Sequence, residues 1–219
     1  MVDFEHARMA MVDNQLRTSG VTDRRILSAM GEVPREAFVP EARQSLAYID
    51  EAHVLPGPAG RAIPAPAPFA RLLQLAEIDA SDSVLDVGTG SGYSAAVLAK
   101  LAGSVAALES DTALVAAARE NLAQVGAENV AVVQGALFDG APNHAPFDVI
   151  LLEGAVTRVP DSLLSQLKEG GRLVALVNSG AAPVANVFVR RGDEFAPRVE
   201  FNANMPPLTR EAAPEAFVF

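Results

Sequence analysis

The stretch Val84-Leu85-Asp86-Val87-Gly88-Thr89-Gly90-Ser91-Gly92-Tyr93 decides the fold. An apolar segment that suits a buried strand runs into a loop with glycine at every second position, and a helical segment follows. Glycine lacks a Cβ, so such a loop lets the backbone approach a nucleotide-like ligand closely. The first helical turn offers free N–H groups to an electronegative group. The stretch therefore predicts a strand–loop–helix unit that binds a nucleotide-like ligand.

The spacing of the glycines distinguishes two classes of nucleotide site. The dinucleotide fingerprint G-x-G-x-x-G needs its third glycine where Tyr93 stands, so a nicotinamide dehydrogenase is disfavoured. The glycines here are Gly88, Gly90 and Gly92, and an acid, Asp86, lies two residues before the first of them. This variant resembles the first motif of class I methyltransferases, which bind S-adenosylmethionine (SAM).

Strand-like and helix-like segments alternate on the C-terminal side of this unit. Such alternation predicts crossover units, and hence a doubly wound parallel α/β sheet covered by helices on both faces. The segments 187–191 and 198–201 flank a turn at Arg191–Glu194 and predict an antiparallel edge of the same sheet. The expected strands are 84–87, 104–108, 130–133, 147–152 and 172–177, and the expected helices are 91–101, 112–125 and 161–167.

The chain before the sheet reads as a helical subdomain with a loop. We expect a helix over 2–19 ended by Gly20, and a short helix over 23–30 capped by Thr22. The stretch 56–68 is so dense in proline and glycine that it predicts a loop or an extended connector rather than a helix. The predicted division is residues 1–70 for the subdomain and its loop, and residues 71–219 for the ligand-binding domain with a C-terminal β extension.

Bulk composition excludes several classes of protein. The net charge of −10 argues against a general electrostatic footprint for nucleic acid, and a small molecule or a protein or peptide fits better. The chain has no cysteine, no apolar run near the roughly 20 residues of a membrane span, and an acidic start without a secretory signal. We therefore expect a cytoplasmic protein with no membrane association, monomeric or weakly dimeric.

In open α/β sheets, ligands bind beyond the carboxyl ends of the strands, where the strand order reverses. Glu109 follows the second expected strand, about twenty residues beyond the glycine loop, where a carboxylate can accept from both ribose hydroxyls. The alternative for Glu109 is an ordinary acidic residue before the next helix. Expected cofactor-binding residues are Asp86, Gly88, Thr89, Gly90, Ser91, Gly92, Glu109 and Ala136.

The histidines and the serines of the chain do not indicate a second functional site. No histidine pair has metal-ligand spacing, so no metal site is predicted. His53 is expected at the surface, with a place in the pocket as the alternative. Ser19 and Ser94 lack the nearby base pattern of a nucleophile.

Beyond the loop, the chain resembles the protein-L-isoaspartate O-methyltransferase family over about residues 8–178. The segment 30–40, MGEVPREAFVP, is close to the family's A-M-x-x-V-P-R-E-x-F-V-P, and 84–98 matches V-L-E-I-G-T-G-S-G-Y-x-A-A-V-L with Asp86 for the glutamate. Further matches are residues 11–17, 21–23, 47–50, 129–130, 146–148 and 166–174. The resemblance implies methylation, with SAM as donor, of the α-carboxylate of isoaspartyl residues, the first step in repair of damaged proteins.

The chain departs from the family at two places. The signature loop G-Q-T-I-S-Q-P aligns with 60–66, where Ala62, Pro64 and Ala65 replace its threonine, serine and second glutamine. None of these three side chains can form a hydrogen bond, so no catalytic residue is assigned. After the third strand the family has G-D-G, and Ala136 replaces the acid that can accept from the adenine amino group.

Two further acids lie near the expected pocket. Asp139 could replace the missing acid only if the loop bends. Glu153, where the family usually has a small or polar residue, is either a pocket acid or a solvated residue beside the loop.

Methyl transfer to a carboxylate rests mainly on alignment and desolvation, so the lost polar groups affect acceptor recognition more than the reaction. Three hypotheses follow. The first is an isoaspartyl-type SAM-dependent methyltransferase, the second is a methyltransferase with another acceptor on the same scaffold, and the third is a catalytically inactive SAM-binding or scaffold protein.

Overall fold

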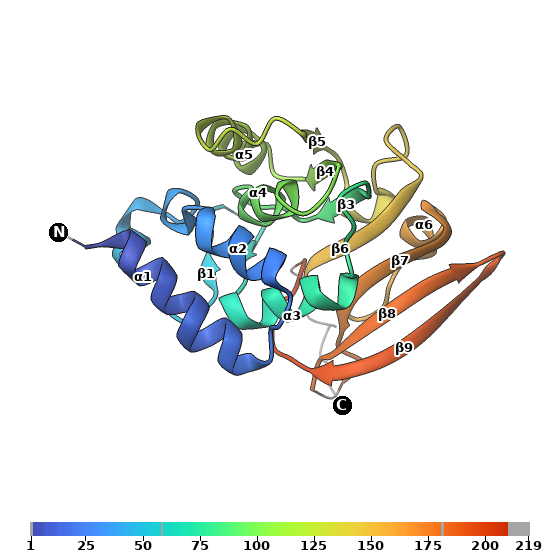
Figure 1. Ribbon diagram of the computed structural model, residues 1–219. Coiled ribbons are helices and arrows are strands. Elements are labelled where there is room, and N and C mark those ends of the chain that lie inside the picture. Colours follow the sequence, from blue (N-terminus) through green and yellow to red (C-terminus); the bar gives the residue numbers. More distant parts are fainter. Residues whose placement is uncertain (1, 58, 181, 210–219) are drawn as a thin grey trace, which may run out of the picture.

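The computed structural model describes residues 2–57, 59–180 and 182–209. Figure 1 shows the N-terminal helices gathered on one side of a twisted sheet, and a long C-terminal hairpin extending from the opposite end. The sheet has seven strands in the order β5-β4-β3-β6-β7-β8-β9. The five strands from β5 to β7 are parallel, as the alternation of segments predicted. Their bounds are β3 Ser83–Val87, β4 Ser104–Glu109, β5 Val130–Gln134, β6 Phe147–Val156 and β7 Leu167–Val177.

The strand order reverses between β3 and β6. The chain runs outward from β3 to β4 and β5, then returns to pair β6 with the other side of β3. Such a reversal leaves a crevice beyond the carboxyl ends of the central strands, because the two connections leave in opposite directions. The glycine loop follows β3 directly and therefore lies at this switch point.

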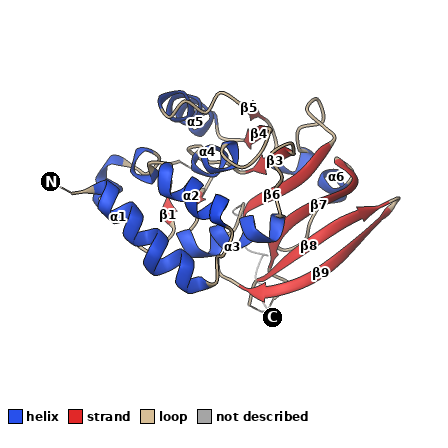
Figure 2. Ribbon diagram, viewed as in Figure 1, coloured by secondary structure: helices blue, strands red, loops and turns tan. Residues whose placement is uncertain are grey.

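The predicted antiparallel edge is confirmed. Strand β8, Val184–Arg191, pairs antiparallel with β7, and β9, Glu194–Asn202, pairs antiparallel with β8. Figure 2 shows the two strands as a long ribbon that projects from the body. Gly192 supplies the turn with a φ of 62°, a value that favours glycine.

The N-terminal part is helical, as predicted, with different ends. Helix α1, Phe4–Met11, continues as a π-helical turn over 12–16 and a 3-10 turn over 17–19, and Gly20 ends it at a φ of 84°. Helix α2 is Arg24–Glu32, and its cap is Asp23, whose carboxylate accepts from the Arg25 N–H. The prediction that Thr22 caps this helix is wrong, because the N–H and hydroxyl of Thr22 instead contact the side-chain oxygen of Gln74.

The proline-rich connector holds more regular structure than the sequence predicted. Two short strands, β1 His53–Val54 and β2 Ala62–Ile63, pair antiparallel. Helix α3 then runs over Pro66–Ala76, so the prediction that prolines exclude a helix up to residue 68 is wrong. The prolines fall in its first turn, where the N–H groups have no partner within the helix and proline costs little.

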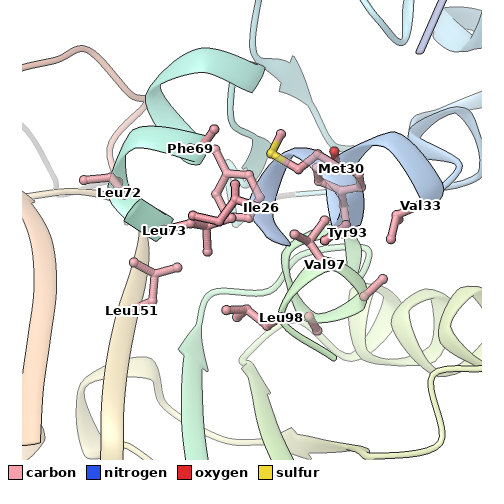
Figure 3. Packing of buried hydrophobic residues seen from close by; sticks show 14 of the residues in the cluster. Ile26, Met30, Val33, Phe69, Leu72, Leu73, Tyr93, Val97, Leu98 and Leu151 are labelled. Carbon is pink, nitrogen blue, oxygen red and sulfur yellow. The ribbon is translucent and has the colours of Figure 1, made fainter. Parts of the chain in front are cut away.

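One face of the sheet carries most of the helices. Helices α1 to α3, with α4 Tyr93–Ala99 and α5 Thr112–Gln124, pack on this face in a continuous apolar cluster. In Figure 3, Phe69 of α3 lies beside Tyr93 of α4, with Met30 and Ile26 of α2 around them. The ring centroids of Phe69 and Tyr93 are 5.9 Å apart. The helical part thereby holds the helix that follows the glycine loop.

The other face has a thinner cover. It carries the four-residue helix α6, Asp161–Leu164, a 3-10 turn over Leu137–Asp139, and the C-terminal Leu208. Strand β6 continues to Val156, four residues beyond the predicted end. Glu153, predicted to follow the strand, therefore lies within it.

The packing predicts the effect of truncating Phe69, which is fully buried. Phe69→Ala should lower the free energy of unfolding by about 3–5 kcal/mol, because it removes the ring and leaves a cavity against Tyr93. Urea unfolding measures the loss, and Val199→Ala, at a residue 69% exposed, is the control with an expected change within about 0.5 kcal/mol. A loss below about 1 kcal/mol for Phe69→Ala would contradict its place in the core.

Candidate donor site

The glycine loop turns sharply at the carboxyl end of β3. Gly88, Gly90 and Gly92 have φ values of 86°, 59° and 97°, which L side chains rarely adopt. The N–H groups of Gly88 and Thr89 donate to the Leu108 carbonyl, at 2.9 and 3.2 Å, which fixes the loop against β4. Ser91 Oγ donates to the Phe38 carbonyl at 2.7 Å. The loop is thus a rigid turn, tied to β4 and to the helical subdomain.

Glu109 lies at the end of β4, fully buried beside this loop. Its Oε1 accepts from the N–H groups of Ser110 and Asp111, at 2.7 and 3.0 Å. Its Oε2 accepts from the Gly90 N–H at 3.1 Å. The following helix is capped by Asp111 rather than by Glu109. The Glu109 carboxylate is thus enclosed by backbone N–H groups of the glycine loop and of the residues that follow β4.

A buried arginine from the connector also contacts Glu109. Arg61 Nε lies 3.0 Å from Glu109 Oε2, and both side chains are almost completely buried. Arg61 Nη2 donates to Ser110 Oγ at 3.0 Å, and Nη1 donates to the Leu208 carbonyl. The oxygens predicted to accept from ribose hydroxyls are therefore occupied by protein donors in this structure.

Two leucines cover the glycines of the loop. A Cβ built on Gly88 would lie 2.5 Å from Leu208 Cδ1, and one on Gly90 would lie 2.7 Å from Leu55 Cδ1. Residues 88–92 are all buried as a result. The close backbone approach that the glycines permit is taken up by side chains of the same chain.

Two acids of the central strands, Asp86 and Glu153, point to the same face of the sheet. Asp86 of β3 is paired with Leu151 of β6, so Glu153, two residues further along β6, points to the same face. Ser94 Oγ donates to Asp86 Oδ2 at 2.7 Å. Among the residues that the structure describes, Asp86 Oδ1 and both carboxyl oxygens of Glu153 have no hydrogen-bond partner other than the carboxyl of the opposite acid. Glu153 is only 6% exposed, which excludes the solvated alternative.

Burial dominates the titration of this pair. It raises the pKa of Asp86 to about 6, although the hydroxyls of Ser94 and Thr89 oppose the shift. Burial, together with the neighbouring Asp86 carboxyl, raises the pKa of Glu153 well above its usual range. Two buried carboxyls without a cation between them resist ionising together.

The other predicted cofactor residues lie in the glycine loop and in the turn after β5. Thr89 and Ser91 are buried in the loop itself. Ala136 begins the 3-10 turn after β5 and is exposed, and Asp139 at the end of that turn is exposed as well. No contact of the structure brings Asp139 to the place of the missing acid, so we assign it no role.

The altered signature loop is held by a buried arginine of the subdomain. Arg35 Nη2 donates to the Pro64 carbonyl at 2.6 Å, and Nε donates to the Ala47 carbonyl at 2.8 Å. The same guanidinium lies 4.7 Å from the centroid of the Tyr93 ring. Ala62 and Ala65 are half-buried, and Pro64 is buried. Arg35 thus anchors the loop backbone at Pro64, while the side chains of Ala62, Pro64 and Ala65 carry no polar group.

His53 is buried rather than at the surface, so that prediction is wrong. It lies in β1, and neither ring nitrogen has a partner within the described part of the chain. Burial, and the charge of Arg35, lower its pKa. A buried neutral imidazole of this kind fits a packing role.

Sequence reasoning missed the two residues that now fill the site, Arg61 and Leu208. Arg61 stands where the family loop has its first glutamine, so the departure was visible, but its partner was not. Leu208 lies 147 residues from Arg61, beyond the segment 8–178 on which the resemblance rests. Neither contact follows from local patterning.

The acid pair predicts a pH dependence of stability. The carboxyls of the unfolded chain ionise near pH 4, and those of the folded protein ionise only at higher pH. The folded state therefore binds more protons in this window, and the free energy of unfolding should fall as pH rises from about 4 through about 6. Urea unfolding across this range measures the fall.

Glu153→Gln should flatten that fall, because glutamine does not ionise. Relative to the wild type, the variant should gain stability between pH 4 and pH 8, because the wild type loses the protons that its folded state holds on the buried pair. Glu128→Gln, at an exposed position, controls for loss of a charge. Parallel curves for the wild type and Glu153→Gln would count against the buried pair.

Comparisons with known proteins identify the family of the chain. The family model described as protein-L-isoaspartate(D-aspartate) O-methyltransferase matches residues 6–212. A protein-L-isoaspartate O-methyltransferase of Koribacter versatilis is 44% identical over 179 residues, 82% of this chain and 80% of that protein. A protein-L-isoaspartate O-methyltransferase 2 of Anaeromyxobacter sp. is 46% identical over 170 residues, 78% of this chain and 69% of that protein.

Solved structures give the same result for the fold. A protein-L-isoaspartate O-methyltransferase structure superposes with a TM-score of 0.78 at 26% identity, and the match covers 93% of this chain and 65% of that one. A putative protein-L-isoaspartate O-methyltransferase of Plasmodium falciparum, in complex with S-adenosyl-L-homocysteine, also has a TM-score of 0.78, at 21% identity, over 93% of this chain and 99% of that one. The chain belongs to the protein-L-isoaspartate(D-aspartate) O-methyltransferase family.

Proposed function

We propose that this protein transfers a methyl group from SAM to the carboxylate of a damaged aspartyl residue in a protein or peptide. Family membership supports the class of reaction. The observation that carries the proposal is the meeting of the glycine loop with Glu109. The Gly90 N–H and the Glu109 carboxylate lie in contact at the switch point of the sheet, where ligands of this fold class bind.

The residues present fit such a donor. Glu109 can accept from ribose hydroxyls, and Gly88 and Gly90 leave backbone surface that no Cβ obstructs. In the described conformation Arg61 and Leu208 cover this surface. Donor binding therefore requires them to move.

The reaction asks little acid–base chemistry of the protein. SAM, when bound, supplies a methyl group on a sulfonium, an activated leaving group for an acceptor oxygen. A carboxylate acceptor is already a nucleophile, so the protein contributes alignment and exclusion of water. The rigid loop of Gly88–Gly92 supplies alignment, and the buried surroundings of Glu109 keep solvent out.

The acceptor side supports a second candidate, a methyltransferase with a different acceptor. Ala62, Pro64 and Ala65 offer no side-chain hydrogen bond where the family has threonine, serine and glutamine. An isoaspartyl backbone bound there would leave polar groups without partners, at about 1–3 kcal/mol each. The anchor of Arg35 on Pro64 nevertheless keeps the loop backbone in place. We therefore expect weak isoaspartyl activity.

The remaining partner predictions rest on sequence. Nothing in the helices of the described residues is long and apolar enough to cross a membrane. A cytoplasmic location, a monomeric or weakly dimeric state, and the lack of nucleic-acid binding stay predictions. A protein or peptide substrate follows from the proposed reaction.

A direct assay tests the proposed function. Incubation with SAM and an isoaspartyl peptide should produce S-adenosylhomocysteine above the level given by the same peptide with ordinary aspartate. Glu109→Ala should abolish the signal, because it removes the ribose acceptor. Arg198→Ala, at an exposed residue outside the site, is the control. Turnover equal to the peptide-free blank would refute isoaspartyl methylation.

The altered loop gives a separate prediction about the acceptor. The triple substitution Ala62→Thr, Pro64→Ser and Ala65→Gln should raise kcat/KM for the isoaspartyl peptide by roughly tenfold per recovered hydrogen bond, about 1.4 kcal/mol each. Steady-state kinetics at saturating SAM measure the gain. An unchanged kcat/KM would show that these positions do not set the acceptor.

A further inference from the structure

We propose that Arg61 and the segment Pro206–Leu208 form a latch that occupies the donor site and that SAM must displace. The proposal rests on the proposed function, because it concerns access to the same site. We call these four residues the donor-site latch. In this arrangement Arg61 and Leu208 set the affinity of the protein for the donor, although neither is expected to contact the reacting atoms.

The latch is held at Arg61 by a network that spans the chain. The guanidinium contacts Glu109 at the end of β4, Ser110 beside it, and the Leu208 carbonyl in the C-terminal segment. Arg61 is 4% exposed and Glu109 is fully buried. A buried charge without its partner is costly, so this pair resists opening unless another group compensates Glu109.

The C-terminal segment is fastened to the sheet by few bonds. The Ala155 N–H donates to the Pro206 carbonyl at 3.0 Å, and the Leu208 N–H donates to the Ala155 carbonyl at 2.8 Å. Pro207 forms a single bridge to Ala155 rather than a continuous ladder. Among the described residues, two backbone hydrogen bonds, the Arg61 contact and the burial of the Leu208 side chain hold the segment, whereas a strand within the sheet has a continuous ladder of hydrogen bonds.

The latch and a donor need the same surface. Leu208 Cδ1 covers Gly88, and the Leu208 backbone lies against Gly154, where an added Cβ would be 2.6 Å from Leu208 Cα. The Glu109 carboxylate accepts hydrogen bonds from Arg61 and from three backbone N–H groups. Few of its lone pairs are therefore left to accept from two ribose hydroxyls. Arg61 and Leu208 therefore cannot occupy this surface at the same time as a nucleoside.

The neighbourhood of the latch favours its release. A pocket of about 740 Å³ lies beside Pro207, lined also by Val156 and Asn178, and gives the segment space to move into.

The first test measures binding of S-adenosylhomocysteine by calorimetry. Arg61→Gln, which places the family's residue in the loop, and Leu208→Ala should each bind at least about tenfold more tightly than the wild type, because a closed state favoured by about ten to one weakens apparent affinity by that factor. Arg198→Gln and Leu164→Ala are matched controls outside the latch, and their affinity should equal that of the wild type.

The second test uses the wild-type protein, so it does not depend on the folding of a variant. Hydrogen exchange of the Ala155 and Leu208 amides should become faster on saturation with S-adenosylhomocysteine, because both hydrogen bonds belong to the closed latch. The Gly90 amide should become slower or stay unchanged. A ligand that merely stabilised the fold would slow exchange at all three positions.

The outcomes separate the latch from the function. Equal affinity of the wild type, Arg61→Gln and Leu208→Ala, with unchanged or slower exchange at Ala155 and Leu208, would overturn the latch and leave the methyltransferase intact. Lack of binding by all three proteins would overturn both. Tighter binding by the variants with faster exchange in the wild type would support the latch.

Discussion

The buried charge of Glu109 is the constraint on which the rest of the site depends. A carboxylate enclosed at the end of a central strand must be compensated, and here its partners come from three separate parts of the chain. The glycine loop gives the Gly90 N–H, the residues after β4 give two more N–H groups, and the connector gives Arg61. The position of the connector thus follows from the need to compensate the Glu109 charge at the carboxyl end of β4.

Arg61 carries the constraint into the C-terminal segment. Its guanidinium reaches both Glu109 and the Leu208 carbonyl, so closing the ion pair also brings Leu208 onto Gly88. On the acceptor side, Arg35 binds the Pro64 carbonyl and the Tyr93 ring, which joins the altered loop to the helix after the glycines. Two buried arginines therefore join the connector to the rest of the structure, Arg61 through Glu109 and Arg35 through the Pro64 carbonyl.

The sequence predicted those features that local pattern determines. The glycines of 88–92 required positive φ values, and the alternation of segments required a parallel sheet, so the strand–loop–helix unit and its switch point were readable. The place of Glu109 beside the loop was readable from its position after the second expected strand, whereas its role toward a ribose stays a prediction. The antiparallel hairpin around Gly192 was readable from its turn.

The features that the sequence did not predict depend on distant contacts or on position within an element. The density of prolines predicts a break in any helix before residue 69, yet in the first turn of α3 they remove no helical hydrogen bond. Glu153 was placed after its strand, because the apolar run ends before the strand does. The contact of Arg61 with Leu208 joins residues 147 positions apart and leaves no periodic trace.

The most direct test of this account is a structure of the protein with S-adenosylhomocysteine bound. We expect the ribose hydroxyls to lie on the Glu109 carboxylate, the glycine loop to keep its backbone, and Leu208 to have left Gly88 together with Arg61. A complex in which the ligand binds elsewhere, while Arg61 stays on Glu109 and Leu208 stays on Gly88, would contradict the assignment of the donor site.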